Sequence, residues 1–150
     1  AVGRAVTHRP LHLRPSSVAL VAAGGAVGTA AREGATLAFP DPGHFPGTLL
    51  LVNVLGAFAL GALLEVLLRL GPDAGRRRTV RLAFGTGLLG GFTTYSAFAV
   101  GTVELLQQGH LWLGLLNALG TVVLGAAATF AGIIAAGTLV RRRGEGAAAT

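Results

Sequence analysis

Four apolar segments, each long enough to cross a lipid bilayer, dominate this sequence. They cover residues 17–39, 47–68, 80–103 and 111–140, with short polar stretches between them. The second segment would extend about 33 Å as a helix, which matches the roughly 30 Å hydrocarbon core of a bilayer. A spanning segment of this length must satisfy its own backbone hydrogen bonds, as a helix does. The segments therefore predict an all-α integral membrane protein with four transmembrane helices.

Arginine residues gather on one side of the predicted membrane domain, residues 17–140. The two tails, 1–16 and 141–150, contain three arginines each and the region 69–81 contains five, whereas Arg32 alone lies toward the other side. Positive residues favour the cytoplasmic side, so both basic tails are predicted to be cytoplasmic in a multi-pass membrane protein. The net charge of +6 then reflects membrane flanks, and no nucleic-acid partner is expected. A secretory signal peptide ending near Ala31 is the disfavoured alternative, because three more apolar segments follow.

The third segment contains a stretch that does not read as an ordinary membrane helix. Residues 85–98 combine several glycines with hydroxyl residues and the single tyrosine of the chain. Glycine weakens a helix interior by about 1 kcal/mol relative to alanine, and polar side chains in lipid need partners or a cavity. We expect the helix to break at Gly90–Gly91, and we expect the break to build an ion site.

Two further polar residues lie within or beside the predicted spans. Asn53 either joins two helices or offers its neutral NH₂ donors to a desolvated anion in a pore. Arg32 either snorkels to the headgroups or places a positive charge at a pore mouth. Small residues four apart, as in Gly24–Gly28 and Ala57–Gly61, predict close helix packing.

The sequence shows no catalytic constellation, so an enzyme is not expected. Glu33, Glu65 and Glu104 fall near segment ends, and there is no cysteine. The alternative function is a proton-coupled small-molecule exporter with four-helix antiparallel subunits, but this needs a carboxylate in mid-membrane. A structural membrane protein without a pore is the third possibility.

Three motifs resemble the signatures of one known family. The sequences GAVGTAAR at 25–32, GTLLLVNVLG at 47–56 and GGFTTYSAF at 90–98 resemble those of the CrcB/Fluc fluoride channels, in the same order and spacing. The similarity covers residues 18–137, which is nearly the whole predicted membrane domain.

The resemblance implies a fluoride-selective channel of the bacterial inner (plasma) membrane that passively exports fluoride from the cytoplasm and lowers its toxicity. It implies an antiparallel dimer with a structural Na⁺ at its centre, bound by the backbone carbonyls of Gly90 and Thr93. Carried over position by position, the fluoride pore residues are Asn53, Tyr95, Ser96, Phe98, Thr121 and Arg32.

Three positions depart from the family pattern: Tyr95, Ala97 and Gly125. Gly125 stands where a second hydroxyl often lies in the fourth helix, so it shortens the polar track. The charge bias also bears on assembly, because an antiparallel homodimer needs one sequence to insert in both orientations. The arginine distribution therefore favours a heterodimer with a related, oppositely oriented subunit, and leaves a homodimer as the alternative.

Overall fold

The structure is a computed structural model that describes residues 14–148, with side chains described for 14–142. The expected N-terminal tail therefore lies almost wholly outside the described residues. The described chain is helical with short connections and has no strand, which confirms the all-α class. Its elements are α1 (Pro15–Ala38), α2 (Gly47–Arg69), α3 (Gly75–Val80), η2 (Arg81–Leu89), α4 (Gly90–Phe92), α5 (Tyr95–Gln107) and α6 (Leu111–Ala148).

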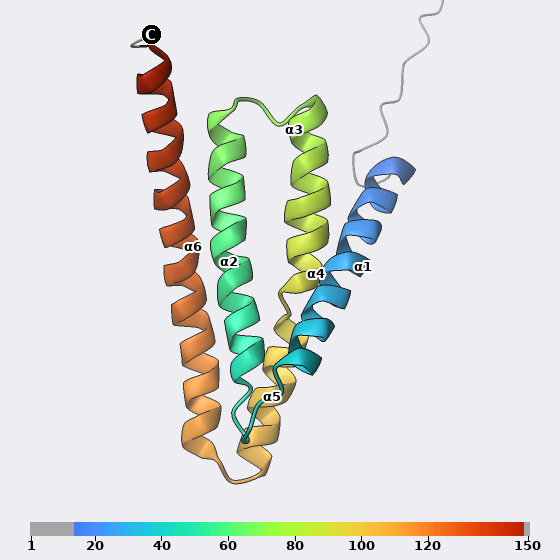
Figure 1. The fold of residues 1–150 in the computed structure, drawn as a ribbon. Helices are drawn as coiled ribbons and strands as arrows, with labels where there is room; N and C mark the ends of the chain where they lie inside the picture. Colours follow the sequence, from blue (N-terminus) through green and yellow to red (C-terminus); the bar gives the residue numbers. More distant parts are fainter. Residues whose placement is uncertain (1–13, 149–150) are drawn as a thin grey trace, which may run out of the picture.

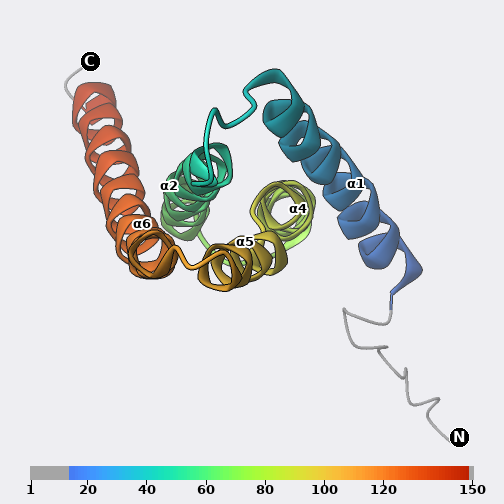
Figure 2. The ribbon, with the colours of Figure 1, turned by 90° about the horizontal axis from the view of Figure 1, so that it is seen from below.

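The helices form a curved layer in which α6 and α1 occupy opposite edges (Figures 1 and 2). α2 packs chiefly against α6, and α1 packs against η2 and α4. The α2–α3 turn lies at the same end of the molecule as the start of α1 and the end of α6 (Figure 1). At the other end, the rings of His44 and His110 bring the α1–α2 and α5–α6 connections together, with centroids 4.6 Å apart.

Two helices within the described residues are long and apolar enough to cross a membrane by length and composition, namely Gly47–Arg69 and Leu111–Arg142. The other two predicted spans differ for local reasons. α1 carries the charged pair Arg32 and Glu33 in its last third. The third span is divided into shorter elements, and Thr93 and Thr94 separate α4 from α5. The predicted spans are therefore not all continuous helices.

Glycine contacts hold α1 against η2 and α4. A Cβ atom built on Gly28 would overlap the Leu88 carbonyl, and one built on Gly91 would overlap the Gly25 carbonyl. The same exclusion applies between α2 and α6, where Gly61 faces the Thr129 backbone and Gly132 faces the Phe58 carbonyl. Such close approach of backbones is how small residues stabilise helix pairs in lipid, where burial of apolar surface gives little driving force.

The third span is interrupted, but not at the expected residues. Gly90 keeps helical dihedrals, φ −65° and ψ −33°, and α4 continues through Gly91 to Phe92. The extended residues are Thr93, with φ −79° and ψ 151°, and Thr94, with φ −145° and ψ 120°. The prediction of a break at Gly90–Gly91 is therefore wrong in position. Gly91 serves instead to bring α4 against α1, whereas Thr94 caps the new helix α5 by accepting a hydrogen bond from the Ala97 amide.

Candidate functional site

The side-chain amide of Asn53, on α2, binds the extended backbone between α4 and α5. Its Oδ1 accepts a hydrogen bond from the Thr94 amide nitrogen at 2.8 Å, and its Nδ2 donates to the Thr94 carbonyl at 3.2 Å. Both backbone groups of Thr94, which is half-buried, are thus satisfied by one side chain, as non-helical backbone in a membrane requires. One N–H of the Asn53 amide carries the bond to Thr94, so a second N–H is left for another acceptor.

The interruption changes the hydrogen bonding of the two carbonyls predicted to bind sodium. In an unbroken helix, the Gly90 carbonyl would accept from the Thr94 amide and the Thr93 carbonyl from the Ala97 amide. Here the Thr94 amide donates to Asn53, and the Ala97 amide donates to the Thr94 hydroxyl at 3.2 Å. Gly90 and Thr93 therefore offer hard backbone oxygen atoms without their helical donors. This is the type of ligand that Na⁺ takes at broken membrane helices.

A groove of about 320 Å³ lies beside the interruption. Four of the residues predicted for the pore line it together: Asn53, Tyr95, Phe98 and, on α6, Thr121. The remaining lining residues are Ala57, Leu60, Thr93, Thr94, Val122, Gly125 and Thr129. No ionisable side chain other than Tyr95 lines it, so the groove offers neutral hydrogen-bond donors and aromatic edges in an apolar wall.

The two aromatic rings of the groove lie on the first turn of α5. Tyr95 and Phe98 have ring centroids 5.7 Å apart and planes inclined at 51°. Tilted rings present their positive edges, which can partly replace the hydration shell of an anion. Tyr95 is 81% exposed and Val122, across the groove, is 64% exposed. The groove is therefore open along one side in the single chain.

A stripe of α6 residues spaced four apart forms another wall of the groove: Thr121, Gly125 and Thr129. Gly125 has no atom within 4 Å of a built Cβ, so its lack of a side chain widens the groove. Thr129 supplies a hydroxyl one turn further along, and this hydroxyl donates to the Gly125 carbonyl at 2.9 Å. Thr129 was not predicted as a site residue, although its spacing from Thr121 places both hydroxyls on one face of a helix. Thr94 was not predicted either, because its part depends on the extended backbone.

Ser96 and Arg32 are not among the residues that line the groove. The Ser96 hydroxyl lies 3.2 Å from the Thr94 hydroxyl, so it is one step removed from the Asn53 contact. Arg32 lies on α1, one turn beyond Gly28, and its Nε is buried without a hydrogen-bond partner within the described residues. A buried donor of this kind fits an acceptor outside the single chain, such as an anion or another subunit.

A second asparagine fixes α6 to α5. Asn117 is 2% exposed, and its Nδ2 donates to the Thr102 hydroxyl at 2.8 Å. The Thr102 hydroxyl in turn donates to the Phe98 carbonyl at 2.9 Å. This short network positions the helix that carries Phe98 against the helix that carries Thr121, so Asn117 has a supporting rather than a lining position.

Comparisons with known proteins agree with the family resemblance of the three sequence motifs. The chain matches the family described as "CrcB-like protein, Camphor Resistance (CrcB)" over residues 19–133. It is 50% identical over 138 residues to "Fluoride-specific ion channel FluC 2" of Leifsonia xyli, covering 92% of this chain and 95% of the relative. It is 45% identical over 117 residues to "Fluoride-specific ion channel FluC 1" of Cutibacterium acnes, covering 77% and 82%. It is 38% identical over 122 residues to "Fluoride-specific ion channel FluC" of Agrobacterium fabrum, covering 78% and 93%.

Proposed function

The chain belongs to the CrcB family, and on this premise we propose that it is a fluoride-specific ion channel that passively exports fluoride from the cytoplasm. The protein is a channel and not an enzyme, as the names of its relatives indicate. The observation that carries the proposal is the groove beside the α4–α5 interruption, where Asn53, Tyr95 and Phe98 meet the hydroxyl stripe of α6.

The chemistry of the groove suits a small, strongly hydrated anion. The Asn53 amide and the Thr121 hydroxyl supply neutral donors, and the ring edges of Tyr95 and Phe98 add weak positive potential. A conducting site must bind an ion well enough to admit it and weakly enough to release it. Neutral donors meet this condition, because a fixed cation in the groove would retain fluoride.

We propose that a second family subunit, inserted in the opposite orientation, closes the exposed side of the groove. Two observations support this assembly: Tyr95 is exposed on the open side of the groove, and the buried Nε of Arg32 has no hydrogen-bond acceptor within the described residues. The arginine bias of the sequence favours a separate, related partner over a second copy of this chain, with the termini of this chain in the cytoplasm.

The carbonyls of Gly90 and Thr93 would hold a structural Na⁺ at the centre of the dimer. Their helical donors are engaged by Asn53 and Thr94, so these oxygens fit a hard cation. When bound, the ion supplies positive charge that joins two interrupted helices. The residues of this chain shape the site: Asn53 fixes the extended backbone, and Thr94 caps α5 and so orients the rings of Tyr95 and Phe98.

Fluoride efflux from proteoliposomes tests the channel. We expect fluoride release down its gradient from vesicles that contain the assembled protein, and no comparable release of chloride. The proton-coupled exporter predicts instead flux that depends on a pH gradient, and no carboxylate lines the groove to support it. Equal chloride and fluoride rates, or no flux with and without a related partner subunit, would contradict the proposal.

A further inference from the structure

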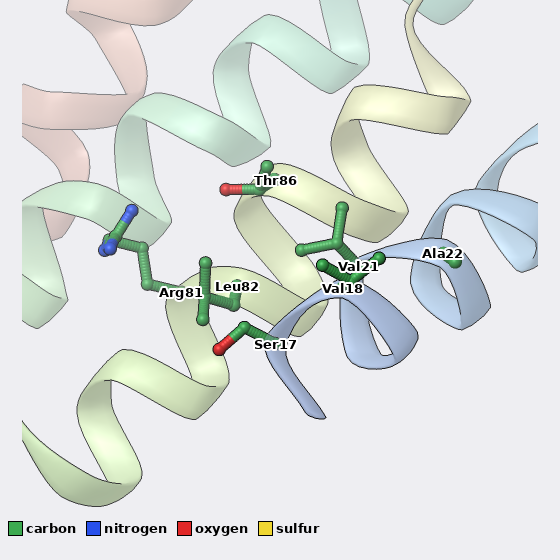
Figure 3. A pocket seen from close by; sticks show the side chains of 7 residues that line it. All are labelled: Ser17, Val18, Val21, Ala22, Arg81, Leu82 and Thr86. Atoms are coloured by element: carbon green, nitrogen blue, oxygen red, sulfur yellow. The ribbon is translucent and has the colours of Figure 1, made fainter. Parts of the chain in front are cut away.

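Two adjoining hollows form one groove between α1 and the α3–η2 helix, far from the fluoride site. The first has a volume of about 500 Å³, and Figure 3 shows Val18 and Val21 of α1 facing Leu82 and Thr86 of η2 across it. The second has a volume of about 400 Å³ and a polar lining: Arg14, Ser16, Ser17, Leu20, Gly75, Arg78, Thr79 and Leu82. Ser17 and Leu82 line both hollows, so the groove is continuous, apolar at one end and basic at the other.

The groove has the polarity gradient of a membrane leaflet. Its basic end lies at the end of the molecule that carries the α2–α3 turn, where α1 and α3 diverge (Figure 1). The arginine distribution places this end at the cytoplasmic surface. From Arg14 to Ala22 the chain advances about 12 Å along α1, which carries the groove from headgroup depth into the hydrocarbon.

Three arginines and one carboxylate, Asp73, set the charge at the basic end. Arg78 donates from Nε and Nη2 to the Asp73 carbonyl at 3.0 and 2.6 Å, which leaves its Nη1 for another acceptor. Arg81 donates to the Asp73 carboxylate at 2.8 Å, and its guanidinium points away from α1 in Figure 3. This hydrogen bond lowers the pKa of Asp73, so the carboxylate is ionised at neutral pH and balances Arg81. The Asp73 carboxylate also lies 3.9 Å from Arg78 Nε, so one carboxylate serves two arginines and the lining keeps a net positive charge beside the hydroxyls of Ser16, Ser17 and Thr79.

We propose that this groove binds one anionic phospholipid of the cytoplasmic leaflet, of the phosphatidylglycerol type. Its phosphate lies between Arg14 and Arg78 with the nearby hydroxyls, and one acyl chain lies along Val18, Val21 and Leu82. Basic pockets between membrane helices on the cytoplasmic side recognise anionic headgroups in this way. The bound lipid fills the space where α1 and η2 diverge and so links the two helices. The site depends on the membrane placement of the chain and not on fluoride conduction.

Lipid binding to the intact assembly in mild detergent, measured by native mass spectrometry, tests the site. We expect preferential retention of phosphatidylglycerol over phosphatidylcholine with the same acyl chains. Arg14→Gln and Arg78→Gln should each weaken phosphatidylglycerol binding about fivefold, from the roughly 1 kcal/mol that an arginine contributes near an anionic surface. Arg76→Gln is the charge-matched control, because Arg76 is close in sequence but does not line either hollow. If Arg76→Gln weakened phosphatidylglycerol binding equally, the site would be overturned, because only a general attraction of the lipid to surface charge would remain.

A steric variant separates the groove from surface charge, and it does not depend on the arginines. Ala22 is exposed and lines the apolar hollow, so Ala22→Phe should fill the groove and displace the lipid at unchanged charge. Undiminished phosphatidylglycerol binding by Ala22→Phe would overturn the proposal.

Two other possible occupants of the groove are distinguished by further measurements. Equal protection against heat by inorganic phosphate would assign the basic end to a free anion, and photo-cross-linking from position 22 to a second subunit would assign the groove to an interface; either result overturns a lipid site. Unchanged elution volume and fluoride efflux establish that each variant is folded.

Discussion

The side chain of Asn53 binds both backbone groups of Thr94, 41 positions further along the chain. This pair of hydrogen bonds joins the first third of α2 to the point where the third span loses its helical conformation. The residue predicted to face an anion is therefore also the residue that keeps the neighbouring backbone extended. Changes at Asn53 should affect the shape of the site as well as its donors.

Replacing Asn53 by leucine should abolish fluoride efflux while the subunits still assemble. The Thr94 amide and carbonyl would both lose their partner, and an unsatisfied buried group costs about 1–3 kcal/mol. We expect efflux to fall at least about tenfold and the melting temperature to drop. Asn53→Asp keeps the acceptor for the Thr94 amide but places a negative charge in the groove, so it should block efflux with a smaller loss of stability. Wild-type efflux in either variant would contradict this account.

Thr129 should contribute to conduction although the family motifs do not include it. Its hydroxyl lines the groove and donates only within α6 among the hydrogen bonds of the described residues. The hydroxyl can rotate from the Gly125 carbonyl toward an anion in the groove, and Thr129→Val keeps the shape but removes this donor, so efflux should fall about 2- to 10-fold, as expected for one hydrogen bond. Thr138→Val is the matched control: its hydroxyl bonds the Ala135 carbonyl in the same helix, outside the groove. Similar efflux in the two variants would remove Thr129 from the ion path.

The glycine contacts of α1 should limit stability more than any polar residue does. Gly28→Ala and Gly91→Ala each place a Cβ against backbone that cannot move aside easily, so α1 should separate from η2 and α4. We expect a marked loss of melting temperature and of assembled protein on size-exclusion chromatography. Gly34→Ala is the control on α1, because nothing lies within 4 Å of its Cβ. That variant should be neutral or slightly stabilising, since alanine favours a helix by about 1 kcal/mol over glycine.

A fixed orientation in the membrane can be measured directly, because the chain has no cysteine. Gln108→Cys places a single thiol in the α5–α6 connection and Ala74→Cys places one in the α2–α3 turn, both at exposed positions. In intact cells a membrane-impermeant maleimide should label position 108 and not position 74. Comparable labelling of both variants would show insertion in both orientations and favour a homodimer of this chain.

Much of the fold could be predicted from apolar length and glycine spacing, and the interruption could not be placed. Gly90–Gly91 looked like the break because glycine disfavours helices. In the structure both residues remain helical, and Gly91 is needed for a different reason, because its contact with the Gly25 backbone of α1 leaves no room for a side chain. The break falls at Thr93–Thr94, where Asn53 supplies hydrogen bonds from another helix. A contact between residues so distant in sequence has no local signature.

The candidate site, like the fold, could be predicted from the sequence only in part. Asn53, Tyr95, Phe98 and Thr121 were each singled out from motif and residue type, and the structure places all four on one groove. Their roles in conduction remain predictions. Thr94 and Thr129 were missed because their importance comes from backbone conformation and from the face of α6 that meets α2, respectively. Arg32 and Ser96 lie outside the groove of the single chain, so their part depends on what a second subunit adds.

The packing of α1 also determines when this helix can find its partners during synthesis of the chain. α1 contacts η2 and α4 far more than it contacts α2, although α2 follows it directly in the chain. Its glycine face therefore has no partner until the ribosome has released the chain through Phe92. A nascent chain that stalls after α2 would expose this face to lipid and to other newly inserted proteins. Translation speed across residues 70–92 thus controls how long the subunit is open to mispairing and degradation.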